Sequence, residues 1–128
     1  MGRKMNARLL ERVWFFVEQR GAIRTDLIKH HYANSYGEEL NLASMTQALL
    51  SSGLFKRVGW YNRNDDSMIE SSLSSTQLGI KNAAYVCVVK AKTLDEILSA
   101  YIEGKRTLRA MDKMPAFVRQ AYSAGVQE

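Results

Sequence analysis

The residue types that most often catalyse reactions or bind metals are few in this sequence. Its two histidines, His30 and His31, are neighbours that diverge by about 100° on a helix, so they cannot readily share a metal ion. Asp26 and His30, four residues apart, are more typical of a helix surface than of a catalytic dyad. Cys87, the single cysteine, lies in an apolar run typical of a buried strand. We therefore expect no catalytic residues, no metal site, no cofactor and no enzymatic activity.

A different kind of chemistry is indicated by an uncharged polar helix predicted over residues 41–52. Leu42, Met45 and Leu49 recur at helical spacing and would be buried, which leaves the opposite face polar. Hydroxyl and amide groups on such a face can hydrogen-bond the edges of DNA bases, and glutamine can bind adenine in a bidentate way. The candidate base-contact residues are Ser44, Thr46 and Gln47. The alternative is that these side chains are simply exposed to solvent.

Positive charge is concentrated in the first half of the chain. The net charge is +5, and residues 1–63 hold ten Lys and Arg against five Asp and Glu, whereas the remainder is balanced. A basic half favours a polyanionic partner, although a solubilising surface would give the same count. The candidate phosphate contacts are Arg24, Lys29, Lys56, Arg57 and Arg63. Lys56 and Arg57 are adjacent on a predicted strand and point to opposite faces, so we expect one of them at most to reach a phosphate.

Hydrophobic periodicity predicts the elements that would position these residues. Helices are predicted over residues 6–20, 25–34 and 41–52, and strands over residues 54–61 and 84–90. Between the strands, residues 62–83 are predicted to be a long, partly mobile hairpin connection with an acidic tip. After the second strand, Thr93 and Glu96 form a capping-box pattern that predicts another helix, and Pro115 is expected to start or kink a last one.

This order of elements resembles the winged helix-turn-helix superfamily. The segment Gly21-Ala22-Ile23-Arg24-Thr25-Asp26-Leu27 resembles the entry into the second helix of that fold. The segment Leu49-Leu50-Ser51-Ser52-Gly53-Leu54-Phe55-Lys56-Arg57-Val58-Gly59 resembles its passage from the recognition helix into the first wing strand. The resemblance covers residues 6–61 and, with the second strand, about 6–90. It implies an α+β winged helix over residues 1–92, with three helices and a two-stranded hairpin, whose third helix enters the major groove.

Two features depart from the family pattern. The connection over residues 32–41 is longer than a tight helix-turn-helix turn, and the wing is longer than usual. The wing also carries Asp65, Asp66 and Glu70, so we expect its tip to point away from DNA or to touch a partner subunit.

Residues 93–128 are predicted to form a helical extension with more apolar side chains than one helix pair on a small domain needs. The candidates for a homodimer interface are Met111, Met114, Phe117, Val118 and Tyr122. The alternative is that these residues complete the core of the monomer.

The function expected from the resemblance is sequence-specific binding of double-stranded DNA, as by a transcriptional regulator of a bacterium or mobile element. One alternative is a small phage- or plasmid-type module that binds and inhibits a host protein, and another is a replication or partition factor. The sequence contains no apolar run long enough for a membrane span and no signal-peptide pattern, so a cytoplasmic protein is expected.

Overall fold

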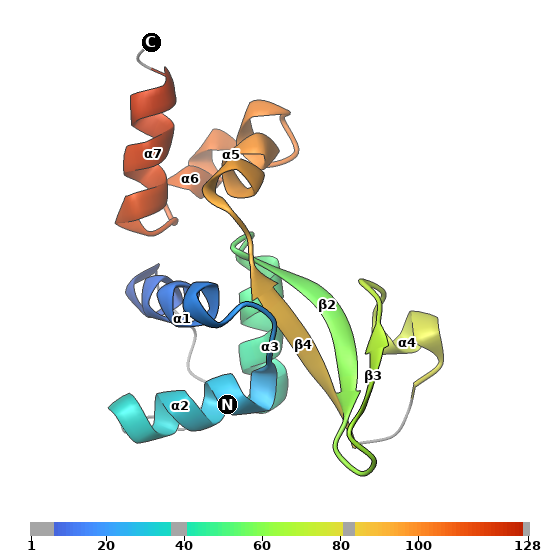
Figure 1. The fold of residues 1–128 in the computed structure, drawn as a ribbon. Coiled ribbons are helices and arrows are strands. Elements are labelled where there is room, and N and C mark those ends of the chain that lie inside the picture. Colours follow the sequence, from blue (N-terminus) through green and yellow to red (C-terminus); the bar gives the residue numbers. More distant parts are fainter. Residues whose placement is uncertain (1–6, 37–40, 81–83, 127–128) are drawn as a thin grey trace.

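The computed structural model describes residues 7–36, 41–80 and 84–126, which form a mixed α+β fold (Figure 1). The elements follow in the order α1 (Ala7–Arg20), β1 (Ile23–Arg24), α2 (Thr25–Tyr36), α3 (Leu42–Ser51), β2 (Phe55–Asn62), β3 (Ser67–Glu70), α4 (Ser75–Leu78), β4 (Tyr85–Ala91), α5 (Leu94–Ile102), α6 (Leu108–Met111) and α7 (Ala116–Val126). None of the helices in these ranges is both long and apolar enough to cross a bilayer.

The first three helices begin and end close to their predicted positions. Gly21 follows α1 with a φ of +76°, a left-handed conformation in which glycine is not strained. The side chain of Asn41 caps α3 by accepting a hydrogen bond from the Ser44 backbone N–H at 3.0 Å. Gly53, with a φ of +84°, ends the turn that follows α3. The second helix runs to Tyr36, slightly beyond the predicted end.

The sheet has four antiparallel strands in the order β1-β4-β2-β3, where two were predicted. Residues 62–83 were expected to be a long, partly mobile hairpin connection, and the described part of this connection also contains a strand and a short helix that were not predicted. Ile69 of β3 pairs with Trp60 of β2, and the short helix α4 is capped reciprocally by Ser74 and Gln77. The sequence of these elements did not reveal them, because each is only four residues long and contains few apolar residues.

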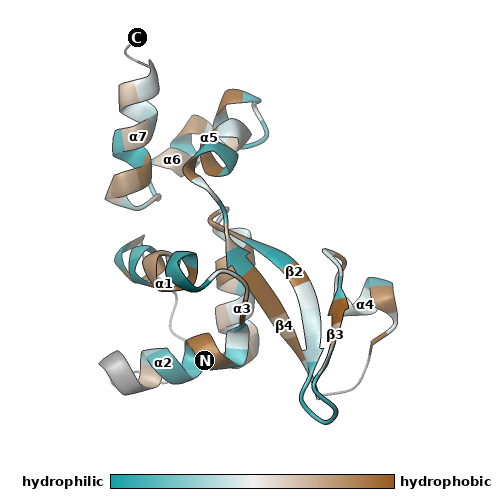
Figure 2. Cartoon of the chain, viewed as in Figure 1, coloured by the Kyte–Doolittle hydropathy of each residue, from teal (hydrophilic) through white to brown (hydrophobic). Residues whose placement is uncertain are grey.

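One hydrophobic core joins the helices to the sheet. Val17 of α1, Ile28 of α2 and Leu49 of α3 are fully buried with Val89 of β4. Figure 2 shows β4 as hydrophobic along most of its length, whereas the turn between β2 and β3 is hydrophilic. Such a strand is expected where a sheet is covered, and β4 lies between β1 and β2.

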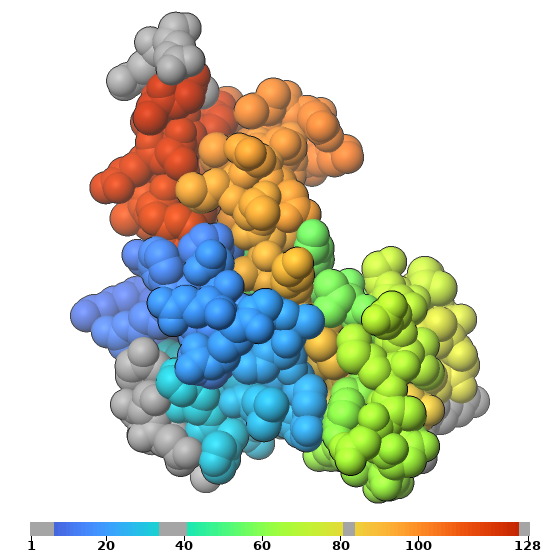
Figure 3. Space-filling model, in the orientation of Figure 1, coloured from blue at the N-terminus to red at the C-terminus, as the bar shows by residue number. Residues whose placement is uncertain are grey.

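The C-terminal helices form one end of the molecule, away from the β2–β3 hairpin (Figure 3). The predicted capping box of α5 is present, since Thr93 and Glu96 bond each other's backbone N–H groups. Pro115 immediately precedes α7, as predicted. The ring of Phe117 packs against Trp14 of α1, with centroids 4.7 Å apart, and thereby joins α7 to the first helix.

The burial of these helices corrects the predicted dimer interface. Met111, Met114 and Val118 are 6%, 4% and 0% exposed and belong to the protomer core. They cannot contact a second chain unless that core opens, so assigning them to an interface was wrong. Phe117 and Tyr122 are only partly buried. Dimerisation remains a prediction that depends on these two residues and their surroundings.

Candidate functional site

The outer face of α3 is open to solvent and carries no charge. Ser44 and Gln47 are exposed on this face, as the helical periodicity predicted. Thr46 is half-buried, and its hydroxyl donates a hydrogen bond to the Leu42 carbonyl at 2.8 Å. Two of the three candidate base-contact residues are therefore free to reach a ligand, while the Thr46 hydroxyl can act only as a hydrogen-bond acceptor.

A groove of about 380 Å³ runs beside this helix. Thr46 and Gln47 of α3 line this groove together with Ser75 of α4. Sheet residues complete the lining, among them Arg57, Trp60, Tyr85 and Cys87. Burial raises the pKa of the Cys87 thiol, although the nearby Arg57 guanidinium opposes this shift. Cys87 is thus a neutral part of the groove rather than a reactive thiolate.

A β-bulge in β2 brings Arg57 and Trp60 to the same side of the sheet. Arg57 pairs with Val89 and Trp60 pairs with Cys87, two positions of β4 that share a face. The register shifts between Arg57 and Gly59, so two residues separate Arg57 from Trp60 instead of one. The Arg57 guanidinium lies 5.3 Å from the centre of the Trp60 ring.

The segment before α4 holds both side chains in place. Arg57 Nη1 donates to the Ser72 carbonyl at 3.3 Å, and Trp60 Nε1 donates to the Leu73 carbonyl at 3.0 Å. Sequence reasoning did not identify these contacts, because residues 71–73 belong to the segment that was expected to be a long, partly mobile hairpin connection.

Lys56 lies on the opposite face of the sheet from Arg57, as predicted for adjacent strand residues. It pairs with Lys90 across β2 and β4, and its Nζ lies 2.8 Å from Oε2 of Glu96. The charge of Lys56 is therefore balanced by Glu96 of α5, and this side chain does not line the α3 groove.

Arg24 is also held by a carboxylate on that same opposite face. Its Nε and Nη2 atoms contact the two Asp26 carboxylate oxygens at 3.0 and 2.5 Å, and its guanidinium lies 4.2 Å from the centre of the Tyr61 ring. The hydrogen bond to Asp26 and the charges of Asp26 and Asp66 raise the pKa of Arg24, against a smaller opposing effect of burial.

The five predicted phosphate contacts therefore do not share one surface with α3. Arg24 and Lys56 lie on the far face of the sheet, since their cross-strand partners Val88 and Lys90 alternate with Val89. Arg57 alone among these three lines the α3 groove. Lys29 is half-buried on α2, and Arg63 is exposed in the turn after β2. The expectation of a single cationic surface is wrong for Arg24 and Lys56.

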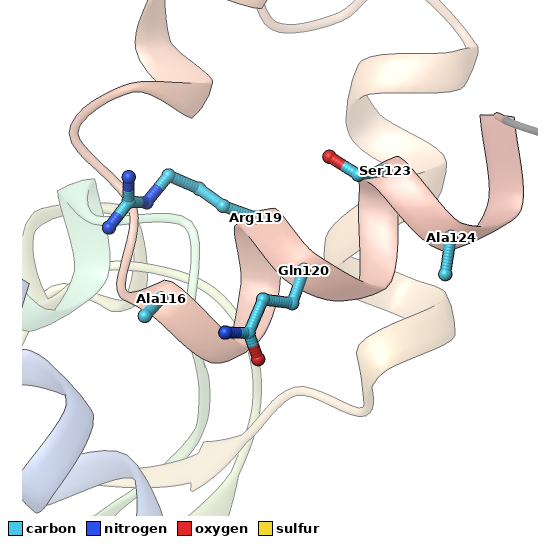
Figure 4. Close-up of a pocket in the computed structure, with 5 residues that line it drawn as sticks. All are labelled: Ala116, Arg119, Gln120, Ser123 and Ala124. Carbon is cyan, nitrogen blue, oxygen red and sulfur yellow. The ribbon is translucent and has the colours of Figure 1, made fainter.

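A second hollow, of about 410 Å³, lies on the outer face of α7. Figure 4 shows that its five labelled side chains all project from this one helix. Arg119 is the only charged residue among them, and its Nε donates to the Met114 carbonyl at 3.1 Å. A hollow lined by one helix, with its cation already bonded to the backbone, is a weaker candidate than the α3 groove.

The described ranges contain no group of three or more His, Cys, Asp or Glu side chains placed to hold a metal ion. The features that distinguish the molecule are therefore the exposed neutral face of α3 and the adjoining groove with Arg57. The sequence matches no family model, no curated protein and no solved structure.

Proposed function

We propose that this protein binds double-stranded DNA through the exposed face of α3, with Arg57 as a phosphate contact beside it. The observation that carries this proposal is that Arg57 and Gln47 line the same groove. A neutral polar helix can read base edges, while an adjacent cation fixes the position of the backbone.

The order of elements supports a winged-helix arrangement for this purpose. Three helices precede a hairpin sheet, and α3 packs on β2 while its polar side stays open. In the proposed complex α3 enters the major groove, and Ser44 and Gln47 contact bases. Such a protein would act as a sequence-specific regulator of transcription.

Phosphate contacts in this proposal are fewer than the sequence indicated. Arg24 and Lys56 are engaged by Asp26 and Glu96, so the phosphate contacts that remain in this proposal are Arg57, which lines the α3 groove, together with Lys29 and Arg63. Fewer contacts mean weaker salt dependence, since each neutralised phosphate contributes about 0.9 to the slope of log affinity against log salt.

The test is fluorescence anisotropy with a labelled random duplex over a series of salt concentrations. Binding should weaken linearly on a log–log plot, and Arg57→Gln should reduce the slope by about 1. Lys113→Gln is the matched control, because Lys113 is exposed between α6 and α7 and its loss changes the net charge equally. Equal effects of both variants would contradict a specific role for Arg57.

A protein-interaction module is the second candidate, and the division of the cations between two sheet faces favours it. A protein partner needs no continuous cationic stripe, and the uncharged α3 face would suit it. Absence of any binding to duplex DNA at low salt would support this candidate and overturn the first.

A further inference from the structure

Arg57 lacks the anionic partner that several other cations of the described residues have. Arg24, Lys56 and Lys105 each form an ion pair, with Asp26, Glu96 and Glu103 respectively. Within the described residues Arg57 pairs with no carboxylate, and its buried Nε atom makes no hydrogen bond. A partly buried guanidinium without a counter-charge is costly, and an anion that enters the groove would reduce that cost.

The surroundings of Arg57 are suited to a flat ligand. The Trp60 indole N–H is already bonded to the Leu73 carbonyl, so this side chain offers the groove an apolar ring. Tyr85 and Leu50 add further apolar surface, while Thr46 and Gln47 supply polar groups along one wall. The described lining contains no Asp or Glu that would repel an anion.

The size and the charge of the groove together limit the ligand class. A volume of about 380 Å³ is at the lower end of the usual range for small-molecule sites. The planar fork of a guanidinium binds a carboxylate through two parallel hydrogen bonds, which a compact spherical anion cannot match as well.

We propose that the groove between α3 and the sheet binds a small aromatic carboxylate, whose acid group pairs with Arg57 and whose ring lies against Trp60. The binding does not require DNA, so it can be tested on the free protein and judged apart from the proposed function. A carboxylate in this position would also occupy the guanidinium assigned to a phosphate.

The test uses 2-naphthoate as the probe and the indole N–H signals of the two tryptophans as the readout in NMR spectra of the ¹⁵N-labelled protein. Trp60 lines the groove, whereas Trp14 is buried in the core and its Nε1 donates to the Lys92 carbonyl. Trp60→Phe assigns the two signals. Naphthoate should shift the Trp60 signal in a saturable manner and leave the Trp14 signal nearly unchanged.

The neutral 2-naphthamide has the same shape and no charge, and it should bind at least about tenfold more weakly. Arg57→Gln should remove this preference, Arg57→Lys should retain part of it, and Lys113→Gln should leave it intact. Each variant is first checked for an unchanged melting temperature, and Arg57→Lys remains informative if Arg57→Gln does not fold.

Three results would overturn the proposal. One is the absence of any shift of the Trp60 signal with naphthoate up to about 10 mM, because the dissociation constant would then be too high for a specific binding site. The second is equal binding of naphthoate and naphthamide. The third is undiminished naphthoate binding by both Arg57 variants.

Discussion

Lys56 Nζ lies 2.8 Å from Glu96 Oε2, and this contact joins β2 to the first turn of α5. The other carboxylate oxygen of Glu96 accepts the Thr93 backbone N–H at 3.1 Å. One side chain thus caps a helix and ties that helix to the sheet. The same contact removes Lys56 from the set of cations that could serve a ligand at α3.

The first prediction concerns the acid stability conferred by Glu96. The hydrogen bond from Lys56, followed by that from the Thr93 backbone, lowers the pKa of Glu96 from 4.5 to about 2. A carboxyl whose pKa is lower in the folded state stabilises the fold above pH 4.5, and this contribution is lost as the pH falls from 4.5 towards 2. Glu96→Gln should therefore flatten the decline of the free energy of unfolding across that interval.

The size of this effect should be modest. The side chains of Lys56 and Glu96 are 39% and 40% exposed, so solvent screens the ion pair. We therefore expect the pair to contribute less than about 1 kcal/mol to the free energy of unfolding. The measurement is chemical denaturation at a series of pH values. Asp95→Asn, which removes an exposed carboxyl of the same turn, is the control, and an identical pH profile for the wild type and Glu96→Gln would refute the prediction.

The second prediction concerns Gly53, which Arg106 covers at the end of α3. A Cβ atom on Gly53 would lie 2.6 Å from Arg106 Cζ, so Gly53→Ala would displace that guanidinium. Its hydrogen bonds to the Ser51 and Ser52 carbonyls, at 2.8 and 3.1 Å, would then be lost. We expect Gly53→Ala to lower the free energy of unfolding by about 1 kcal/mol because of the left-handed backbone, and by about 1–2 kcal/mol more because these hydrogen bonds are lost.

Gly21→Ala is a matched control for this effect. Gly21 has a similar positive φ, and a Cβ atom there would meet nothing within 4 Å, so only the backbone cost applies. Denaturant titration should show Gly53→Ala as the more destabilising change. In an Arg106→Ala background the difference between the two substitutions should disappear; its persistence would show that Arg106 is not its cause.

The parts of this fold that could be predicted from the sequence are those specified by neighbouring residues. Asn41 caps α3, and Thr93 and Glu96 cap α5, because each cap bonds a backbone group three residues away. In contrast, β3 depends on pairing with β2, and its four residues show no clear alternation of apolar and polar types. Composition alone therefore gave no reason to expect it.

The candidate site was predictable only in part, because some of its features depend on contacts between residues far apart in the sequence. Ser44 and Gln47 are exposed because helical periodicity fixes the face on which they lie. The placement of Arg57 beside Trp60 depends on a bulge, since strict alternation would put these residues on opposite faces. The pairing of Lys56 with Glu96 spans 40 residues, and no local pattern indicates it.

The third prediction distinguishes a core role for Val118 from a role in dimerisation. Val118 is fully buried within the protomer, so Val118→Ala should lower the free energy of unfolding by about 1–3 kcal/mol. Because no second chain is involved, this loss should be the same at all protein concentrations. Thermal melts over a wide concentration range provide the measurement, with the exposed Gln120→Ala as the control. A loss that grows on dilution would instead support an interface at this residue.

The last prediction tests base recognition by α3. If Gln47 contacts a base edge, Gln47→Ala should reduce discrimination at one base pair by about 1–3 kcal/mol and leave binding to random duplex DNA almost unchanged. Gln47 carries no charge and is exposed, so its removal should alter neither the salt dependence nor the melting temperature appreciably. The preferred sequence is first selected from a randomised duplex library with the wild-type protein.

Binding of single-base variants of that sequence then gives the discrimination at each position. Gln120→Ala removes the same side chain from α7 and should leave every position unaffected. Loss of discrimination confined to neighbouring base pairs would fit a helix in the major groove, because one side chain reaches one or two bases. Unchanged preference at every position in Gln47→Ala would exclude Gln47 as a base contact, even if the protein binds DNA tightly.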